Sequence, residues 1–406
     1  MPLSYADVVR ALSGEPLPAL FVDLDAFDRN VERVAAAARG HGITARLASK
    51  SLRVPDLLAR ALERGAPYLR GVMAYSAAEA ALLAERGVDD LLLAYPVWQE
   101  RDLEHVFRAL ERGRSIAVAV DDPLAVTRWS EAARARGVTV RLVACVDMSL
   151  RALGDRVHVG VRRSPLATPA DVVALARHAR ACGGAELVGL LGYEAQIAGL
   201  PDAAPEDGRA LRLAKALLKR ASMRELAARR RAIVAALREA GFELDLVNGG
   251  GTGSLEVTSP ATGVTETTAG SALFKPHLFD GYESALVRSL EPSCFFALEV
   301  TRRATRDVVT CLGGGYVASG PPGRDKAPLP WLPSGLTLLP MEMAGEVQTP
   351  VREPPSRAPL ALGAPVVFRH AKAGEIAERF SEVLLVSAGR VVGRASTYRG
   401  LGACFF

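Results

Sequence analysis

The sequence has few cysteines and histidines and no long hydrophobic run. Its five cysteines lie far apart and form no Cys-x-x-Cys pair, so neither a disulfide framework nor a zinc ribbon is indicated. No stretch of about 18 uncharged apolar residues occurs, and residues 1–7 lack the basic segment and apolar core of a secretory signal. We therefore expect a cytoplasmic protein with no membrane partner.

The chain does contain enough apolar sequence for a large core. Its 406 residues exceed one ordinary domain and suit a barrel of about 250 residues joined to a smaller module. The net charge of +5 is spread over arginine-rich stretches such as 224–231, where no aromatic residues interleave with the arginines. We interpret these stretches as solvated helix faces and expect no nucleic-acid partner.

Short β-rich runs alternate with helical patterns through the first two thirds of the chain. The strand-like runs are 19–23, 44–49, 71–75, 91–95, 115–120, 139–146, 186–191 and 244–247. Apolar strands separated by helices predict parallel pairing with both faces of the sheet covered. About seven or eight such units before residue 280 favour a closed (β/α) barrel over an open sheet.

After about residue 285 the β-rich runs follow one another without helices. These runs are 295–301, 307–312, 364–369, 382–386 and 390–398. The proline- and glycine-rich stretch 319–340 interrupts them, and we expect it to cover a site or an interface. We predict an α/β fold in which a (β/α)8 TIM-type barrel over 18–285 is followed by a C-terminal β domain over 286–406, which also takes in 1–17.

Lys50 is the first candidate for chemistry, because the carboxyl ends of barrel strands line the active site. It comes directly after the apolar run 45–49. An amine in that place can form a Schiff base with an aldehyde. The alternative is a lysine that begins a helix and points into water.

A glycine cluster, residues 248–254, follows the strand-like run 244–247. Three consecutive glycines and then Thr-Gly-Ser let the backbone turn sharply and direct amides and hydroxyls toward a phosphate. A flexible loop is the competing interpretation, although it leaves the hydroxyl residues unexplained. The lysine of a nucleotide P-loop is absent. Together with Lys50, this cradle suits a phosphorylated aldehyde cofactor.

Two further side chains follow strand-like runs. Tyr193 comes after 188–192, so we expect it at the barrel mouth, where its ring can lie beside a cofactor; a packed core tyrosine fits equally well. His370 ends the run 365–369, and a lone histidine is usually structural.

In combination, these segments resemble the fold-type III pyridoxal-phosphate enzymes, and within them the alanine racemase-like branch of D-threonine aldolase and D-serine dehydratase. The similarity spans nearly the whole chain. It runs in order through Pro18–Asp25, Lys50, Gly192–Glu194, Asn248–Gly253, Thr265–Ser271 and Gly363–His370.

The resemblance implies roles for these residues. Lys50 would hold pyridoxal 5′-phosphate as a Schiff base and serve as a catalytic base, and Tyr193 would lie against the cofactor as a second catalytic group. The remaining cofactor-binding positions would be Asn248, Gly250, Gly251, Thr252 and Gly253. In such enzymes a second subunit usually helps to enclose the site, so we expect a homodimer.

The chain departs from this branch at its metal site. There, a histidine equivalent to His370 is followed two residues later by cysteine or aspartate, and the pair binds a divalent metal. Here that second position is Lys372, and Gln196 stands where the family pattern has another histidine. A protonated ammonium cannot ligate a metal, so we doubt the usual site. Our hypothesis is that Lys372, His370 or both replace the metal as catalytic acid or electrophile; a carboxylate ligand from Glu375 is the alternative.

The sequence therefore predicts a pyridoxal-phosphate-dependent lyase for small β-hydroxy-D-amino acids, acting by aldol cleavage or by dehydration and deamination. A racemase of the same fold is the nearest alternative, with Tyr316 as a candidate second base. A decarboxylase fits less well, because its cysteine-bearing substrate motif is not evident. A non-catalytic cofactor-binding protein is a further alternative, against which the additional β domain argues.

Overall fold

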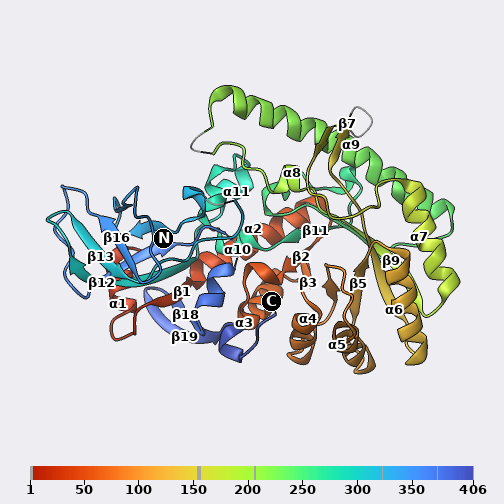
Figure 1. The fold of residues 1–406 in the computed structure, drawn as a ribbon, viewed down its shortest axis with the longest axis horizontal. Coiled ribbons are helices and arrows are strands. Elements are labelled where there is room, and N and C mark those ends of the chain that lie inside the picture. Colours follow the sequence, from red (N-terminus) through yellow and green to blue (C-terminus); the bar gives the residue numbers. More distant parts are fainter. Residues whose placement is uncertain (1–2, 153–156, 205–206, 322, 373, 406) are drawn as a thin grey trace.

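The computed structural model describes residues 3–152, 157–204, 207–321, 323–372 and 374–405. The described chain forms two lobes, a barrel ringed by helices and a second sheet beside it (Figure 1). The predicted (β/α)8 barrel with a following β domain is confirmed.

Eight parallel strands close the barrel, and most of them are apolar enough to be covered by helices on their outer faces. In chain order they are β2 (Thr44–Ala48), β3 (Leu69–Ala74), β4 (Leu91–Leu93), β5 (Ile116–Val120), β6 (Val140–Cys145), β9 (Ala185–Gly192), β10 (Leu246–Gly249) and β11 (Glu266–Ala269). Strand β11 closes the ring by pairing with β10 on one side and β2 on the other.

The helices around the barrel turn their apolar faces to the strands. They are α2 (Leu24–His41), α3 (Pro55–Gly65), α4 (Ala77–Glu85), α5 (Glu100–Glu111), α6 (Pro123–Ala135), α7 (Pro169–Cys182) and α9 (Arg209–Glu239). Short helices α8 (Ala195–Ala198), α10 (Ser271–Phe274) and α11 (Ala285–Ser289) and the hairpin of β7 (Leu150–Ala152) with β8 (Val157–Val159) lie in the connections. The arginines of 224–231 belong to α9, the long green helix along the upper side of the barrel in Figure 1.

The second lobe is a nine-stranded sheet. Its strands are β1 (Ala19–Asp23), β12 (Cys294–Arg303), β13 (Val308–Leu312), β14 (Leu329–Leu332), β15 (Thr337–Leu338), β16 (Gln348–Arg352), β17 (Pro365–Arg369), β18 (Glu382–Ser387) and β19 (Arg390–Ser396). The amino-terminal helix α1 (Tyr5–Ala11) packs on this sheet through Val8, in a cluster with Phe21 and Phe295.

One strand lies in a different sheet from the one predicted. The run 19–23 reads as the first strand of the barrel alternation, but β1 pairs with β12 and β18 in the second sheet. All five of its residues are buried, as in a barrel strand, because this sheet is also covered on both faces at that point. Where one domain ends and the other begins remains a prediction.

Part of the stretch 319–340 is also regular structure. It contributes strands β14 and β15, and β14 pairs with β17. No helix in the described part of the chain is both long and apolar enough to cross a membrane.

Candidate active site

Lys50 lies at the barrel mouth, in the short 3-10 turn Ser49–Ser51 that follows β2. Its side chain is exposed, and Nζ donates a hydrogen bond of 2.9 Å to the hydroxyl of Tyr95, which comes two residues after β4. The amine is therefore accessible yet held by a neighbouring strand end. Sequence reasoning missed Tyr95, although its place just beyond a barrel strand was a signal that could have found it.

The glycine cluster forms a tight turn after β10. Gly250 has φ +78° and its N–H donates 2.5 Å to Glu194 Oε2. A Cβ on Gly253 would lie 2.3 Å from both the Ala198 carbonyl oxygen and a ring carbon of Tyr282. Glycine is needed at both positions, by backbone conformation at the first and by lack of space at the second.

Tyr193 lies against this cluster. A Cβ on Gly251 would be 3.3 Å from its ring, and the guanidinium carbon of Arg163 is 5.8 Å from the ring centre. Burial raises the pKa of the Tyr193 phenol, against the lowering effect of Arg163, and the nearby Tyr95 adds to the rise. The phenol of Tyr193 is therefore neutral, and its ring forms one side of the barrel mouth.

A buried ion pair supports Tyr193 and the glycines. Glu194 and Arg230 are both nearly inaccessible and contact each other directly, and Arg230 Nη1 also donates 2.9 Å to the Thr262 carbonyl. Glu194 joins the Tyr193 segment to Gly250, so the two predicted binding elements are fixed relative to each other. The interpretation of 224–231 as a solvated helix face is wrong for Arg230, which is buried, because nothing in its helical surroundings marks it as the arginine that turns inward.

Asn248 is engaged inside the barrel. Its Nδ2 donates 2.7 Å to Glu266 Oε1, and its Oδ1 accepts a 2.9 Å bond from the Thr268 hydroxyl. Glu266 is in turn paired with the buried Arg46. The nitrogen and the oxygen of the Asn248 side chain are thus both bonded to side chains of strand β11. Contact between Asn248 and a cofactor stays a prediction.

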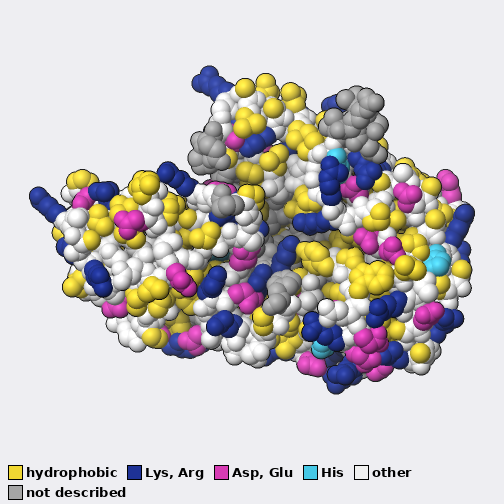
Figure 2. All heavy atoms as spheres, viewed as in Figure 1, with side chains coloured by type: hydrophobic (Ala, Val, Ile, Leu, Met, Phe, Trp, Pro, Cys, Tyr) yellow, Lys and Arg dark blue, Asp and Glu magenta, His cyan; other side chains and the backbone are white. Residues whose placement is uncertain are grey.

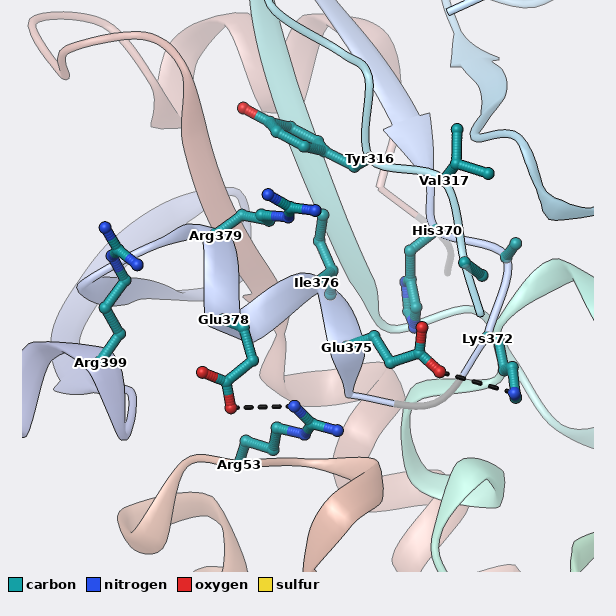
Figure 3. Close-up of a pocket in the computed structure, with 12 residues that line it drawn as sticks. Arg53, Tyr316, Val317, His370, Lys372, Glu375, Ile376, Glu378, Arg379 and Arg399 are labelled. Atoms are coloured by element: carbon teal, nitrogen blue, oxygen red, sulfur yellow. Dashed lines mark hydrogen bonds and ion pairs between the residues drawn. The ribbon is translucent and has the colours of Figure 1, made fainter. Parts of the chain in front are cut away.

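A cavity of about 320 Å³ lies where the two lobes meet (Figure 3). Lys and Arg side chains gather around the hollow between the lobes in Figure 2. The cavity is lined by Arg53, Tyr316, Val317, Ala318, His370, Ala371, Lys372, Glu375, Ile376, Glu378, Arg379 and Arg399. Three side chains singled out in the sequence, Tyr316, His370 and Lys372, therefore share one pocket.

Lys372 is held by the 319–340 stretch. Its Nζ donates 2.8 Å to Ser319 Oγ and lies 3.6 Å from Glu375 Oε1. Burial alone would raise the pKa of Glu375, but hydrogen bonds from Ser319 and the charge of Lys372 lower it below its usual value. Glu375 is thus a carboxylate that keeps the ammonium of Lys372 in place.

The pocket is joined to the Lys50 turn. A Cβ on Gly374 would lie 2.7 Å from the backbone of Ser51, and Arg53 Nη1 donates 2.9 Å to Glu378. Arg53 Nε also donates 3.2 Å to the Lys50 carbonyl. The segment after His370 therefore packs on the turn that carries Lys50.

The resemblance noted in the sequence would pair His370 with a metal ligand at residue 372, where this chain has a lysine. Within the described residues, no group of three or more His, Cys, Asp or Glu side chains is arranged to hold a metal ion. Lys372 is a cation, and the buried Gln196 donates 2.7 Å to the Met148 carbonyl. The second ligand position is therefore occupied by a group that repels a metal.

Comparison with known proteins agrees with this architecture. The model of the family described as "Alanine racemase, N-terminal domain" matches residues 22–277. D-threonine aldolase from Arthrobacter sp is 28% identical over 305 residues, which cover 74% of this chain and 73% of that protein. 3-Hydroxy-D-aspartate aldolase from Paracoccus denitrificans (strain Pd 1222) is 27% identical over 63% of this chain and 60% of its own length.

A solved structure is similar along nearly the whole chain. The crystal structure of D-threonine aldolase from Filomicrobium marinum has a TM-score of 0.78 and 24% identity, and the match covers 96% of each chain. At that identity the likeness shows a common fold, including the second lobe.

Proposed function

The chain belongs to the alanine racemase N-terminal domain family, and on this premise we propose that it is a pyridoxal-phosphate-dependent lyase acting on β-hydroxy-D-amino acids. The resemblance noted in the sequence is thus confirmed. The observation that carries the proposal is the exposed amine of Lys50 at the end of a barrel strand, in a mouth that also holds Tyr193 and the glycine cluster.

The residues of the mouth fit pyridoxal phosphate. Lys50 would hold the cofactor covalently and carry a proton to or from Cα, and Tyr95 would keep its amine in place. The turn of Gly250, Gly251, Thr252 and Gly253 would take the phosphate, with the ring of Tyr193 beside it. When bound, the cofactor supplies an electron sink for the charge left at Cα.

Lys372 is the group we assign to the β-oxygen of the substrate. In aldol cleavage the β-hydroxyl must lose its proton before the Cα–Cβ bond breaks; His370 would accept that proton while the ammonium of Lys372 stabilises the alkoxide that forms. In a dehydration the ammonium can instead protonate the leaving hydroxyl. Ser319 and Glu375 hold the ammonium on the pocket wall, and His370 is the neighbouring group that can exchange a proton. In this arrangement the cation of Lys372 does the work for which related enzymes use a metal.

A product assay tests the proposal. The holoenzyme is incubated separately with D-threonine, D-serine and D-alanine, with and without excess chelator, and scored for glycine, keto acid and L-alanine. We expect glycine or keto acid at the same rate with chelator present. Activity that disappears with chelator and returns with a divalent metal would contradict the role of Lys372.

A racemase is the second candidate, because Tyr316 lines the same pocket as His370 and Lys372. Burial raises the pKa of its phenol, while Arg379 lowers it. Formation of L-alanine without glycine or keto acid would favour this candidate. A non-catalytic cofactor-binding protein would leave all three D-amino acids unchanged.

We also propose that the protein is a homodimer. Val317 at the pocket, Met341 and Val347 are exposed apolar side chains on the second lobe, with exposed fractions of 51%, 95% and 61%. A second subunit would cover such side chains.

A further inference from the structure

A buried carboxyl lies next to the Lys50 turn and is not used in the proposed reaction. Glu79, on α4, is completely inaccessible to solvent. Its Oε2 accepts the N–H of Tyr75 at 2.7 Å, and its Oε1 accepts the hydroxyl of Tyr398 at 2.6 Å. Ser49, the residue before Lys50, lies close enough to lower the pKa of the carboxyl, and its own hydroxyl donates 2.9 Å to the Met73 carbonyl.

These partners come from three separate parts of the chain. Ser49 follows β2, Tyr75 follows β3, and Tyr398 lies beyond β19 in the carboxyl-terminal segment. The backbone N–H of Tyr398 donates 3.1 Å to the carbonyl of Arg53, three residues after Lys50. The carboxyl-terminal segment therefore also contacts the chain that follows the Lys50 turn. One side chain therefore ties two barrel strands to the second lobe at the turn that carries Lys50.

The charged and titratable groups around Glu79 do not neutralise it directly. Arg53 is the cation that acts on it, but the guanidinium lies 5.3 Å from the centre of the Tyr75 ring and is paired with Glu378. The other titratable partners are the phenols of Tyr75 and Tyr398. A carboxyl buried without an ion pair is costly, so a role in packing alone does not account for it.

We propose that Glu79 is a positioning residue that fixes the Lys50 turn against the carboxyl-terminal segment and thereby sets the reactivity of the Lys50 amine toward pyridoxal phosphate. This inference rests on the role assigned to Lys50 above. Protonation changes the bonds of this carboxyl, because the carboxylate accepts from the Tyr398 hydroxyl whereas a protonated Glu79 can itself donate, with Tyr75 N–H still bound in either state.

The protonation of Glu79 gives this role a measurable signature. Burial raises its pKa to about 7, although the bonds from Tyr398, Ser49 and Tyr75 lower it. Its charge therefore changes near neutral pH, at a carboxyl bonded to Tyr398, whose backbone N–H binds the Arg53 carbonyl at the end of the Lys50 turn. The visible absorbance of bound pyridoxal phosphate is expected to follow this change.

The test uses Glu79→Gln, which keeps the size of the side chain but cannot ionise. The control is Glu85→Gln on the same helix, where the carboxylate is exposed and paired with Arg112. Holoenzymes are titrated with pH while the visible absorbance is recorded, and kcat and KM are measured. In Glu79→Gln we expect the transition near neutral pH to move or disappear and kcat to fall about tenfold at unchanged KM. Glu85→Gln should match the wild type.

An unchanged absorbance titration and kcat in folded Glu79→Gln would overturn the inference. If that variant does not fold, Tyr398→Phe, which removes one bond to the carboxyl, carries the test with the same two measurements. In it, a moved transition supports the inference and an unmoved one overturns it. Absence of cofactor absorbance in the wild type would instead refute the proposed role of Lys50.

Discussion

Residue 372 is the position at which we propose that this chain departs from a metal-dependent chemistry. A cysteine or aspartate there would complete a metal pair with His370, whereas Lys372 brings its own positive charge, held by Ser319 and Glu375. The difference was visible in the sequence. What the sequence could not show is that a serine from the 319–340 stretch and a carboxylate three residues further on both hold the ammonium.

Replacing Lys372 with methionine removes the charge and keeps the length of the side chain. We expect kcat to fall about a hundredfold or more, because the β-oxygen loses its acid or electrophile. The control is Lys326→Met, which removes a lysine of the 319–340 stretch that is paired with Asp325. A steady-state assay of both variants in the presence of chelator checks this, and equal activities would speak against the assignment.

Glu79 also predicts how stability depends on pH. Its pKa is raised in the folded protein to about 7 from an ordinary value of 4.5, so its contribution to stability is fully present below pH 4.5 and is lost as the pH rises through 7. The loss is on the order of 3 kcal/mol. Urea unfolding at a series of pH values should show the wild type losing this stability relative to Glu79→Gln; parallel curves would contradict it.

At the scale of elements, the sequence located most strands but not always their sheet. Barrel strands such as β5 and β6 are mostly apolar runs, and their predicted bounds differ from the observed ones by one residue at the start of β5 and by one residue at each end of β6. Strand β11 has the sequence Glu-Thr-Thr-Ala and shows no apolar pattern. It closes the barrel through polar contacts of Glu266 with Arg46 and Asn248, which depend on strands far away in the sequence.

The residues of the candidate site also divide into those that the sequence predicts and those that it does not. Lys50, Tyr193 and the glycine cluster were predicted because each directly follows a strand-like run. Tyr95 is hydrogen-bonded to Lys50, and Glu79 is hydrogen-bonded to Tyr398 as well as to its neighbour Tyr75. Contacts between residues so distant in the sequence as Glu79 and Tyr398 leave no local pattern.

The glycine turn predicts the effect of one added methyl group. In Gly253→Ala the new Cβ would collide with the Ala198 carbonyl and the Tyr282 ring, so the turn must open. We expect a loss of stability of about 1–3 kcal/mol and weaker cofactor binding. Gly40→Ala on α2 is the matched control, since no atom lies within 4 Å of the added carbon. Titration with pyridoxal phosphate and thermal unfolding check both variants; normal binding by Gly253→Ala would exclude a phosphate cradle at this turn.

At the scale of the whole molecule, the pocket depends on both lobes. The barrel supplies Arg53, and the second lobe supplies Tyr316, His370 and Lys372. Strand β1, which precedes the barrel in sequence, lies between β12 and β18 of the second sheet. Segments before and after the barrel therefore both belong to the second lobe. This connectivity fixes the lobes to each other at the site.

The proposed homodimer is a prediction at this scale. Light scattering coupled to gel filtration should give twice the 43.0 kDa mass of one chain. Val347→Asp should lower that mass by placing a charge among apolar side chains, whereas Val392→Asp, an equally exposed valine on β19, should not. A wild-type mass of one chain would refute the dimer.

The central claim is that Lys50 binds pyridoxal phosphate covalently. The most direct measurement reduces the holoenzyme with borohydride and locates the pyridoxyl group by mass spectrometry of its peptides. We expect the group on the peptide that contains Lys50, and we expect Lys50→Ala to show neither this adduct nor turnover. An adduct on another lysine of the folded protein, or turnover that survives in Lys50→Ala, would contradict it.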